Sequence, residues 1–128
     1  MSRYYVLVLV PGQPSVEEAC DVAEDLLYPY MHDPDDPDKP FHFDYMYSPD
    51  DIAALTDDKV TQHMWPVSGI LDQVPLAELQ VEAVLTPDGI WHEQEPGLLW
   101  DDETWLQEVR RMLEEHRGCL ALRYVLHI

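Results

Sequence analysis

Two apolar runs near opposite ends of the chain constrain its fold more than any other feature of the sequence. The first run, YYVLVLV, covers residues 4–10, and Pro11 and Gly12 end it. This run is too short for a helix, is enriched in Tyr and Val, and indicates a strand buried on both faces. The second run, LALRYVLHI, covers residues 120–128 and predicts a final strand. We expect these two strands to lie at the centre of one sheet.

Helical patterns follow the first strand and precede the last one. Ser15 and Glu18 have the spacing of a capping box, and apolar residues then recur every three or four positions until Pro29 ends the pattern. The second pattern begins at an acidic cluster, carries its apolar residues on one stripe, and has basic residues toward its end at Gly118. The sequence therefore predicts one helix over 15–28 and another over 101–117.

The segment between the first helix and residue 79 shows little regular pattern. Residues 32–40 (HDPDDPDKP) alternate prolines with acidic residues, which is incompatible with a helix or a strand. Ser48 and Pro49 favour the start of a short helix near 49–55. Residues 41–47 (FHFDYMY) contain enough aromatic residues for a strand or a packed loop. We interpret residues 31–78 as an irregular insertion with a short helix near 49–55.

A β-hairpin is predicted after the insertion. Residues 79–85 (LQVEAVL) alternate with a period of two, residues 86–89 (TPDG) have the composition of a type I turn, and residues 90–93 (IWHE) can pair back. The order of elements is then β-α-[insertion]-β-β-α-β, which is the order of the ferredoxin-like fold. We predict a single α+β domain over residues 1–128, with an antiparallel sheet and two helices on one face.

Charge is the most unusual property of the composition. The chain has 7 Lys and Arg against 26 Asp and Glu, a net charge of −19. Such a charge attracts basic partners and repels nucleic acid and anionic lipid. Nucleic-acid binding is disfavoured further because seven scattered basic residues cannot neutralise a run of phosphates. The alternative interpretation is that the charge serves solubility alone.

Several functional classes lack their motifs in this sequence. The five glycines do not form a nucleotide-binding loop, and no serine nucleophile elbow, HExxH or paired CxxC occurs. His32, His42 and His63 have no spacing that would fix metal ligands, so no metal and no cofactor is predicted. Cys20 and Cys119 are interpreted as small buried side chains, and a disulfide between them is the alternative.

The start of the chain and its hydropathy predict where the protein resides. The sequence begins MSR and passes directly into the first strand, a pattern without a signal peptide. No apolar stretch approaches the roughly 20 residues of a membrane span. We expect a cytoplasmic protein with no membrane segment, either a monomer or a homodimer.

Two sets of residues are candidates for binding. The main prediction is a non-enzymatic interaction domain of unknown function that holds a basic protein partner on an acidic face, which consists of Glu17, Asp21, Glu24, Asp25, Asp33, Asp35 and Asp36. The alternative is a small ligand- or metal-binding protein or enzyme, since aromatic residues beside a His–Glu pair can line a pocket. That pocket comprises Trp91, His92, Glu93 and Trp100.

Both ends of the chain resemble a group of uncharacterised bacteriophage and bacterial proteins. The resemblance rests on YYVLV at 4–8, AVLTPDGIWHE at 83–93 and the terminal His127 and Ile128, and with the segments around them it covers roughly half of the chain. It implies one folded unit spanning both ends and a phage or mobile-element origin, but no activity. The middle of those proteins is longer and contains cysteines that this chain lacks, and Leu126 stands where they often have Cys.

Overall fold

The computed structural model describes residues 3–12, 14–31, 35–36, 38, 43–57, 63–94 and 102–127, except for the side chains of residues 3 and 77. None of the helices in these ranges is long and apolar enough to cross a bilayer. In chain order the elements are β1 (Arg3–Pro11), α1 (Val16–Leu27), the 3₁₀ helix η1 (Tyr28–Tyr30), β2 (Tyr45–Tyr47), α2 (Pro49–Thr56), β3 (Met64–Pro66), α3 (Val67–Gln73), α4 (Leu76–Leu79), β4 (Ala83–Leu85), β5 (Trp91–Glu93), α5 (Glu103–Glu115) and β6 (Cys119–His127).

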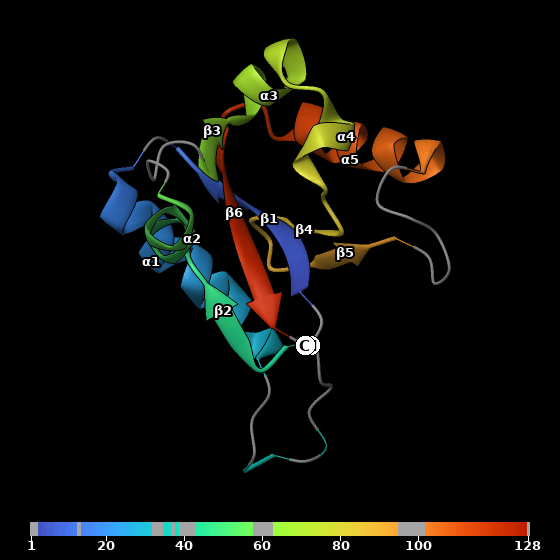
Figure 1. The fold of residues 1–128 in the computed structure, drawn as a ribbon. Helices are drawn as coiled ribbons and strands as arrows, with labels where there is room; N and C mark the ends of the chain where they lie inside the picture. The colour runs from blue at the N-terminus through green and yellow to red at the C-terminus, as the bar shows by residue number, and fades with distance from the viewer. Residues whose placement is uncertain are drawn as a thin grey trace.

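A mixed six-stranded sheet forms the centre of the molecule (Figure 1). The strand order is β2-β6-β1-β4-β5, and β3 also pairs with β6. β6 runs antiparallel to β1 along the whole length of both strands, whereas β4 runs parallel to β1. The two apolar runs at the ends of the chain are therefore neighbours in the middle of the sheet, as predicted.

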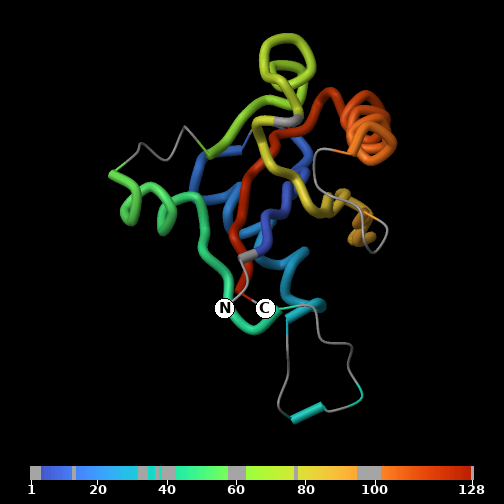
Figure 2. Tube along the Cα trace, turned by 45° about the vertical axis from the view of Figure 1, so that its right-hand side comes forward, coloured from blue at the N-terminus to red at the C-terminus, as the bar shows by residue number. Residues whose placement is uncertain are grey.

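Helices cover both faces of this sheet (Figures 1 and 2). Val6, Val8 and Val10 of β1 point to one face, where they pack in a core with buried residues of α1. Leu7 and Leu9 point to the other face and pack in a second core with α3, α4 and α5. Successive side chains of a strand point to opposite faces, so an uninterrupted apolar strand fits a sheet that is covered on both sides.

The sheet differs in two respects from the predicted ferredoxin-like arrangement. That arrangement has an antiparallel sheet with both helices on one face, whereas here β4 is parallel to β1, and α1 and α5 lie on opposite faces. The reason lies in the insertion, because a parallel pair needs a long crossover, and α3 and α4 provide that connection across the second face. The coarser prediction of an α+β chain is confirmed.

The segment 31–78 holds more regular structure than one short helix. α2 lies where the helix was predicted, and Ser48 and Asp51 form a reciprocal capping box at its start. β2 and β3 pair with opposite ends of β6, so the segment also supplies the edge of the sheet next to β6. β2 (YMY) lies within residues 41–47, where a strand was one of two alternatives. β3 (MWP) was not predicted, because three residues are too few for an alternating pattern.

The predicted turn of the hairpin is present. The Gly89 N–H donates to the Thr86 carbonyl oxygen at 2.9 Å, and Gly89 has a φ of +83°, which a residue without Cβ adopts readily. The first arm is shorter than predicted, because Leu79 ends α4 and β4 covers only 83–85. β4 is buried throughout and β5 is the last strand of the sheet beside it.

Cys20 and Cys119 are free thiols on opposite faces of the sheet. Cys20 belongs to the core under α1, and Cys119 packs against the core under α5. Burial raises the pKa of both thiols. Cys20 is buried, as predicted, whereas Cys119 is only partly buried, and the alternative disulfide does not form.

Candidate functional site

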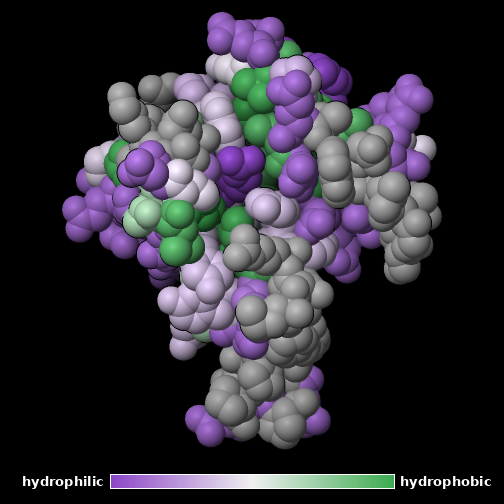
Figure 3. Space-filling view, viewed as in Figure 1, coloured by the Kyte–Doolittle hydropathy of each residue, from purple (hydrophilic) through white to green (hydrophobic). Residues whose placement is uncertain are grey.

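The predicted acidic face is centred on α1. Glu17, Asp21 and Asp25 lie four residues apart and form one exposed stripe along this helix. Like charges at this spacing repel each other, so the stripe does not serve the stability of the helix. Glu24 is only partly exposed, because it packs toward the sheet and accepts a hydrogen bond from the Tyr124 hydroxyl at 3.2 Å. In Figure 3 hydrophilic residues lie at the left edge of the molecule, where Figure 1 shows the start of α1, while α2 covers much of the rest of this helix in that view.

The acidic loop contributes a separate group of charges. Asp35 and Asp36 are exposed, and the stretch 35–36 lies away from α1 in both Figure 1 and Figure 2. Asp33 lies outside the described residues. The members of the predicted face that the structure describes therefore form two groups, and the α1 group is the one attached to the body of the domain.

A groove of about 420 Å³ lies beside the C-terminal half of α1. We call it the α1–β2 groove, since α1 and β2 contribute most of its walls. α1 ends at Leu27, and η1, which contains Pro29, then carries the chain to Met31. Met31 forms a β-bridge with Phe43 just before β2. The residues that line the groove are Glu24, Asp25, Tyr28, Met31, Tyr45, Met46 and Asp51.

Two exposed tyrosines belong to this groove. Tyr28 is 69% exposed and Tyr45 is 54% exposed, although both are large aromatic residues. The ring of Tyr45 meets the ring of Tyr47 edge-on at 5.0 Å, which limits its motion. Tyrosine is enriched in protein interfaces because it offers a large contact area at little cost in conformational entropy. The two exposed tyrosines are thus a feature that this groove shares with protein-binding surfaces.

The charge around the groove is of one sign. None of its lining residues is Lys or Arg. Arg111 pairs with Glu108 and Glu115 at 2.9 Å each, and Arg117 pairs with Glu114 at 2.9 Å, so these cations lie on or just after α5, over the opposite face of the sheet. Because no Lys or Arg of the described residues lines the groove, its carboxylates produce a negative field that steers positively charged molecules toward it.

Repulsion among these carboxylates predicts that added salt stabilises the fold. Raising NaCl from about 0.01 M to about 0.1 M shortens the Debye length from about 30 Å to about 10 Å. We expect Tm to rise by a few degrees, which for a domain of this size corresponds to about 1 kcal/mol. Differential scanning calorimetry at pH 7 measures the change, with sucrose at equal osmolality as the control. A Tm that stays constant or falls would contradict this account of the charge.

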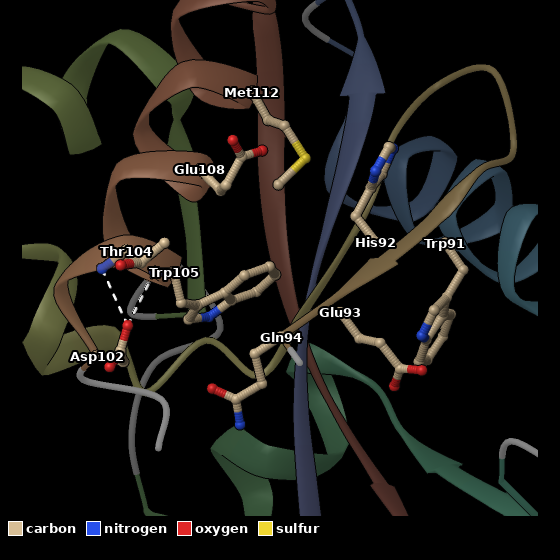
Figure 4. A pocket seen from close by; sticks show the side chains of 9 residues that line it. All are labelled: Trp91, His92, Glu93, Gln94, Asp102, Thr104, Trp105, Glu108 and Met112. Carbon is tan, nitrogen blue, oxygen red and sulfur yellow. Dashed lines mark hydrogen bonds between the residues drawn. The ribbon is translucent and has the colours of Figure 1, made fainter. Parts of the chain in front are cut away.

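A second and larger hollow of about 690 Å³ lies between β5 and α5 (Figure 4). We call it the β5–α5 pocket. Trp105, Glu108 and Met112 are spaced by three and four residues, so they share the face of α5 that is turned toward the pocket. The other lining residues are Trp91, His92, Glu93, Gln94, Asp102 and Thr104.

The residues of the predicted Trp–His–Glu pocket point to different faces of the sheet. His92 pairs with Val84, which belongs to the core under α5, so His92 faces α5. Trp91 and Glu93 face the other side, where Trp91 stacks on Tyr4 at 6.2 Å and the Tyr4 hydroxyl lies 3.2 Å from a Glu93 oxygen. Trp100 lies outside the described residues. Trp91, His92 and Glu93 all line the β5–α5 pocket, although the side chains of Trp91 and Glu93 turn to the other face of the sheet.

His92 is held by the hairpin turn. Its Nε2 lies 3.2 Å from the Thr86 hydroxyl, which in turn donates to the Asp88 carboxylate. Because the Thr86 hydroxyl donates its proton to Asp88, its oxygen can only accept a hydrogen bond from His92. In the neutral imidazole Nε2 is therefore the donor and Nδ1 the acceptor. Hydrogen bonds from the Thr86 hydroxyl and from the Ile90 N–H lower the pKa of Asp88, so that this carboxylate is ionised at neutral pH. No described carboxylate hydrogen-bonds directly to His92.

Several lining residues were not predicted as site residues. Tyr45, Met46 and Asp51 come from the insertion, and Glu108 and Met112 from α5. Their sequence patterns indicate only exposed or core positions, and tertiary contacts bring them to the two hollows. Within the part of the chain that the structure describes, no three His, Cys, Asp or Glu side chains gather as a metal-binding group.

Comparison with protein-family models, with curated proteins and with solved structures gives no match to this chain.

Proposed function

We propose that this protein is a non-enzymatic acidic binding domain that holds a basic segment of a protein partner in the α1–β2 groove. The observation that carries the proposal is the composition of the groove. It combines the carboxylates of Glu24, Asp25 and Asp51 with the exposed rings of Tyr28 and Tyr45, and no Lys or Arg lines it. A partner that presents Lys or Arg side chains beside apolar ones is complementary to this surface.

The two kinds of side chain have different parts in this binding. The carboxylates steer a basic partner toward the groove and fix its orientation, while contributing little net affinity at the exposed rim. The tyrosines bury the largest contact area, and residues of this kind carry most of the energy of measured interfaces. Met31 and Met46 offer flexible apolar contacts that adapt to the segment.

The phage or mobile-element origin remains a separate prediction. It rests on the resemblance of the chain's two ends to phage-type proteins. The groove provides no evidence about this origin. The partner is accordingly identified here by its chemistry, a basic protein segment, and by no organism or pathway.

Neutralising the groove is expected to abolish partner capture. The test variant carries Asp25→Asn and Asp51→Asn, which are close in shape to the native residues. The amide oxygen introduced at position 51 still accepts the hydrogen bond from the Ser48 N–H at the start of α2. Wild-type and variant protein are immobilised and exposed to host lysate at physiological salt. Quantitative mass spectrometry of the eluates is expected to show a basic protein on the wild type that is lost from the variant.

A control with the same loss of charge separates the groove from the net charge. Asp72→Asn with Glu78→Gln also removes two exposed carboxylates, but from α3 and α4 on the other face of the sheet. We expect this variant to retain the partner. Equal loss from both variants would show that net charge alone governs capture, and capture by the groove variant at the wild-type level would contradict the proposal.

A further inference from the structure

The β5–α5 pocket has the size and the floor of a small-molecule site. Its volume of about 690 Å³ lies within the roughly 300–1,000 Å³ of such sites. Trp105 and Met112 are 5% and 2% exposed, and the Trp105 indole N–H donates to the Val81 carbonyl at 2.7 Å. That bond holds the indole in place, so the pocket keeps a fixed apolar surface on the α5 side.

An unsatisfied acceptor lines the same pocket. The side-chain oxygen of Gln94, Oε1, is buried and accepts no hydrogen bond from the residues that the structure describes. Buried side-chain oxygens in folded proteins nearly always have a donor, so an orphaned one needs an explanation. In the view of Figure 4 the Gln94 amide extends toward the Asp102 end of the pocket. A ligand with N–H donors bound there would satisfy this oxygen.

The charged residues of the pocket determine whether a cation or an anion binds there. Asp102 and Glu108 line its α5 side, and none of the pocket's lining residues is Lys or Arg. Asp102 uses one oxygen, Oδ1, to cap α5 through the Thr104 N–H at 3.0 Å, and its second oxygen retains acceptor capacity. Glu108 is bridged to Arg111 at 2.9 Å, but both side chains are about half exposed, and such a bridge exchanges readily. The pocket therefore favours a cation.

We propose that the β5–α5 pocket binds a primary alkylammonium group. Its three N–H donors match the Gln94 Oε1 and the Asp102 carboxylate at one end, and its carbon chain lies on Trp105 and Met112. Glu108, which comes from α5 beside Met112 in Figure 4, adds negative charge that favours the cation. This site is distinct from the α1–β2 groove and uses none of the groove's residues, so the two proposals succeed or fail independently.

The probe for this proposal is n-butylammonium chloride, titrated into the ¹⁵N-labelled full chain at pH 7. The Trp105 indole N–H resonance reports on the floor of the pocket, and the Gln94 side-chain and backbone N–H resonances report on its polar end. We expect saturable shifts at these groups with butylammonium, and no saturable shifts with 1-butanol or butyrate, which have a similar chain without the positive charge.

Two matched pairs of variants localise the binding. Gln94→Met removes the acceptor at similar volume, and Gln107→Met makes the same change at an exposed position of α5 outside the pocket. Glu108→Gln and Glu115→Gln each remove one carboxylate paired with Arg111, but only Glu108 lines the pocket. We expect the dissociation constant to rise about tenfold for Gln94→Met, which removes a hydrogen-bond acceptor of the charged group. The rise for Glu108→Gln should be smaller, because this change removes only an attraction from the other end of the pocket. For the two controls the dissociation constant should stay within about twofold of the wild type, the range of surface changes that touch no bound group.

Two results would overturn the proposal. One is a set of shifts that spread over the acidic surface without saturating, which is how a cation behaves when it merely condenses on a protein of charge −19. The other is equal weakening by the pocket variants and their controls. A parallel titration with Nα-acetyl-lysine N-methylamide distinguishes the source of the group: comparable binding assigns the pocket to a lysine side chain, and binding of butylammonium alone assigns it to a free amine.

Discussion

Leu7→Ala is expected to lower the free energy of unfolding by about 2–5 kcal/mol, the cost of removing a buried leucine side chain without filling its volume. Leu7 is 0% exposed in β1 and lies in the core with Val109 and Met112 of α5. The loss includes the hydrophobic transfer energy of the side chain and the contacts across the cavity that remains. Urea denaturation, followed by circular dichroism and analysed by linear extrapolation, measures it.

This substitution distinguishes the observed architecture from a two-layer one. In a sheet covered on one face only, either Leu7 with Leu9 or Val6 with Val8 would face water, and truncation on the open face would be nearly neutral. The control is Leu55→Ala, the same change at a position that is 73% exposed, where we expect an effect within about 0.5 kcal/mol. A cost for Leu7→Ala as small as that of the control would contradict packing of α5 on the second face.

Tyr28→Ala combined with Tyr45→Ala is expected to weaken binding of the captured partner about 30-fold or more. Interface residues that dominate affinity cost about 2 kcal/mol or more when truncated, and about 1.4 kcal/mol corresponds to a factor of ten in Kd. Both tyrosines are more than half exposed, so their truncation should leave the fold intact. Isothermal titration calorimetry of the partner's basic segment gives the change in Kd, and the thermal unfolding curve verifies the fold.

Ile90→Ala serves as the control for the tyrosine variant. Ile90 is 51% exposed in the hairpin turn and does not line the α1–β2 groove, so its truncation removes exposed apolar surface at a different place. We expect an unchanged Kd. If Ile90→Ala weakened binding as much as the tyrosine variant, exposed apolar area in general, and not the groove, would carry the affinity.

The elements with strong local signals were predictable from the sequence. The cap at Ser15, the apolar stripes of α1 and α5, and the turn at Thr86–Gly89 each depend on residues a few positions apart. The apolar run 4–10 also indicated burial on both faces, which a fold with helices on one face cannot provide. The burial of both faces of this run therefore agrees with the observed layers, whereas the order of elements alone favoured helices on one face.

The strand order and the two hollows depend on contacts between distant parts of the chain. Whether β4 or β5 lies beside β1 is decided by the path of α3 and α4, two short helices whose sequences show no clear period. The α1–β2 groove joins α1 to β2 and α2 across more than 15 residues of intervening chain. Asp25 was therefore predictable as an exposed acid, but its approach to Tyr45 and Asp51 was not.

The alternation of β5 explains why the predicted Trp–His–Glu pocket took a different form. Consecutive strand residues point to opposite faces, so Trp91 and Glu93 join Tyr4 on one side while His92 faces α5 on the other. Sequence adjacency suggested one cluster, whereas the pleat separates it. The residues that complete the pocket, Trp105 and Glu108, stand more than ten positions further along the chain.

The most direct test of the central proposal is to map the bound partner segment on the ¹⁵N-labelled protein by chemical-shift perturbation. The account predicts that the largest backbone changes fall at Asp25, Tyr28, Tyr45 and Asp51, the residues that line the α1–β2 groove. The amides of β5, at the opposite edge of the sheet, and of α5, on its other face, should change little. Largest changes on α5, or small changes spread evenly over all the acidic surfaces, would contradict it.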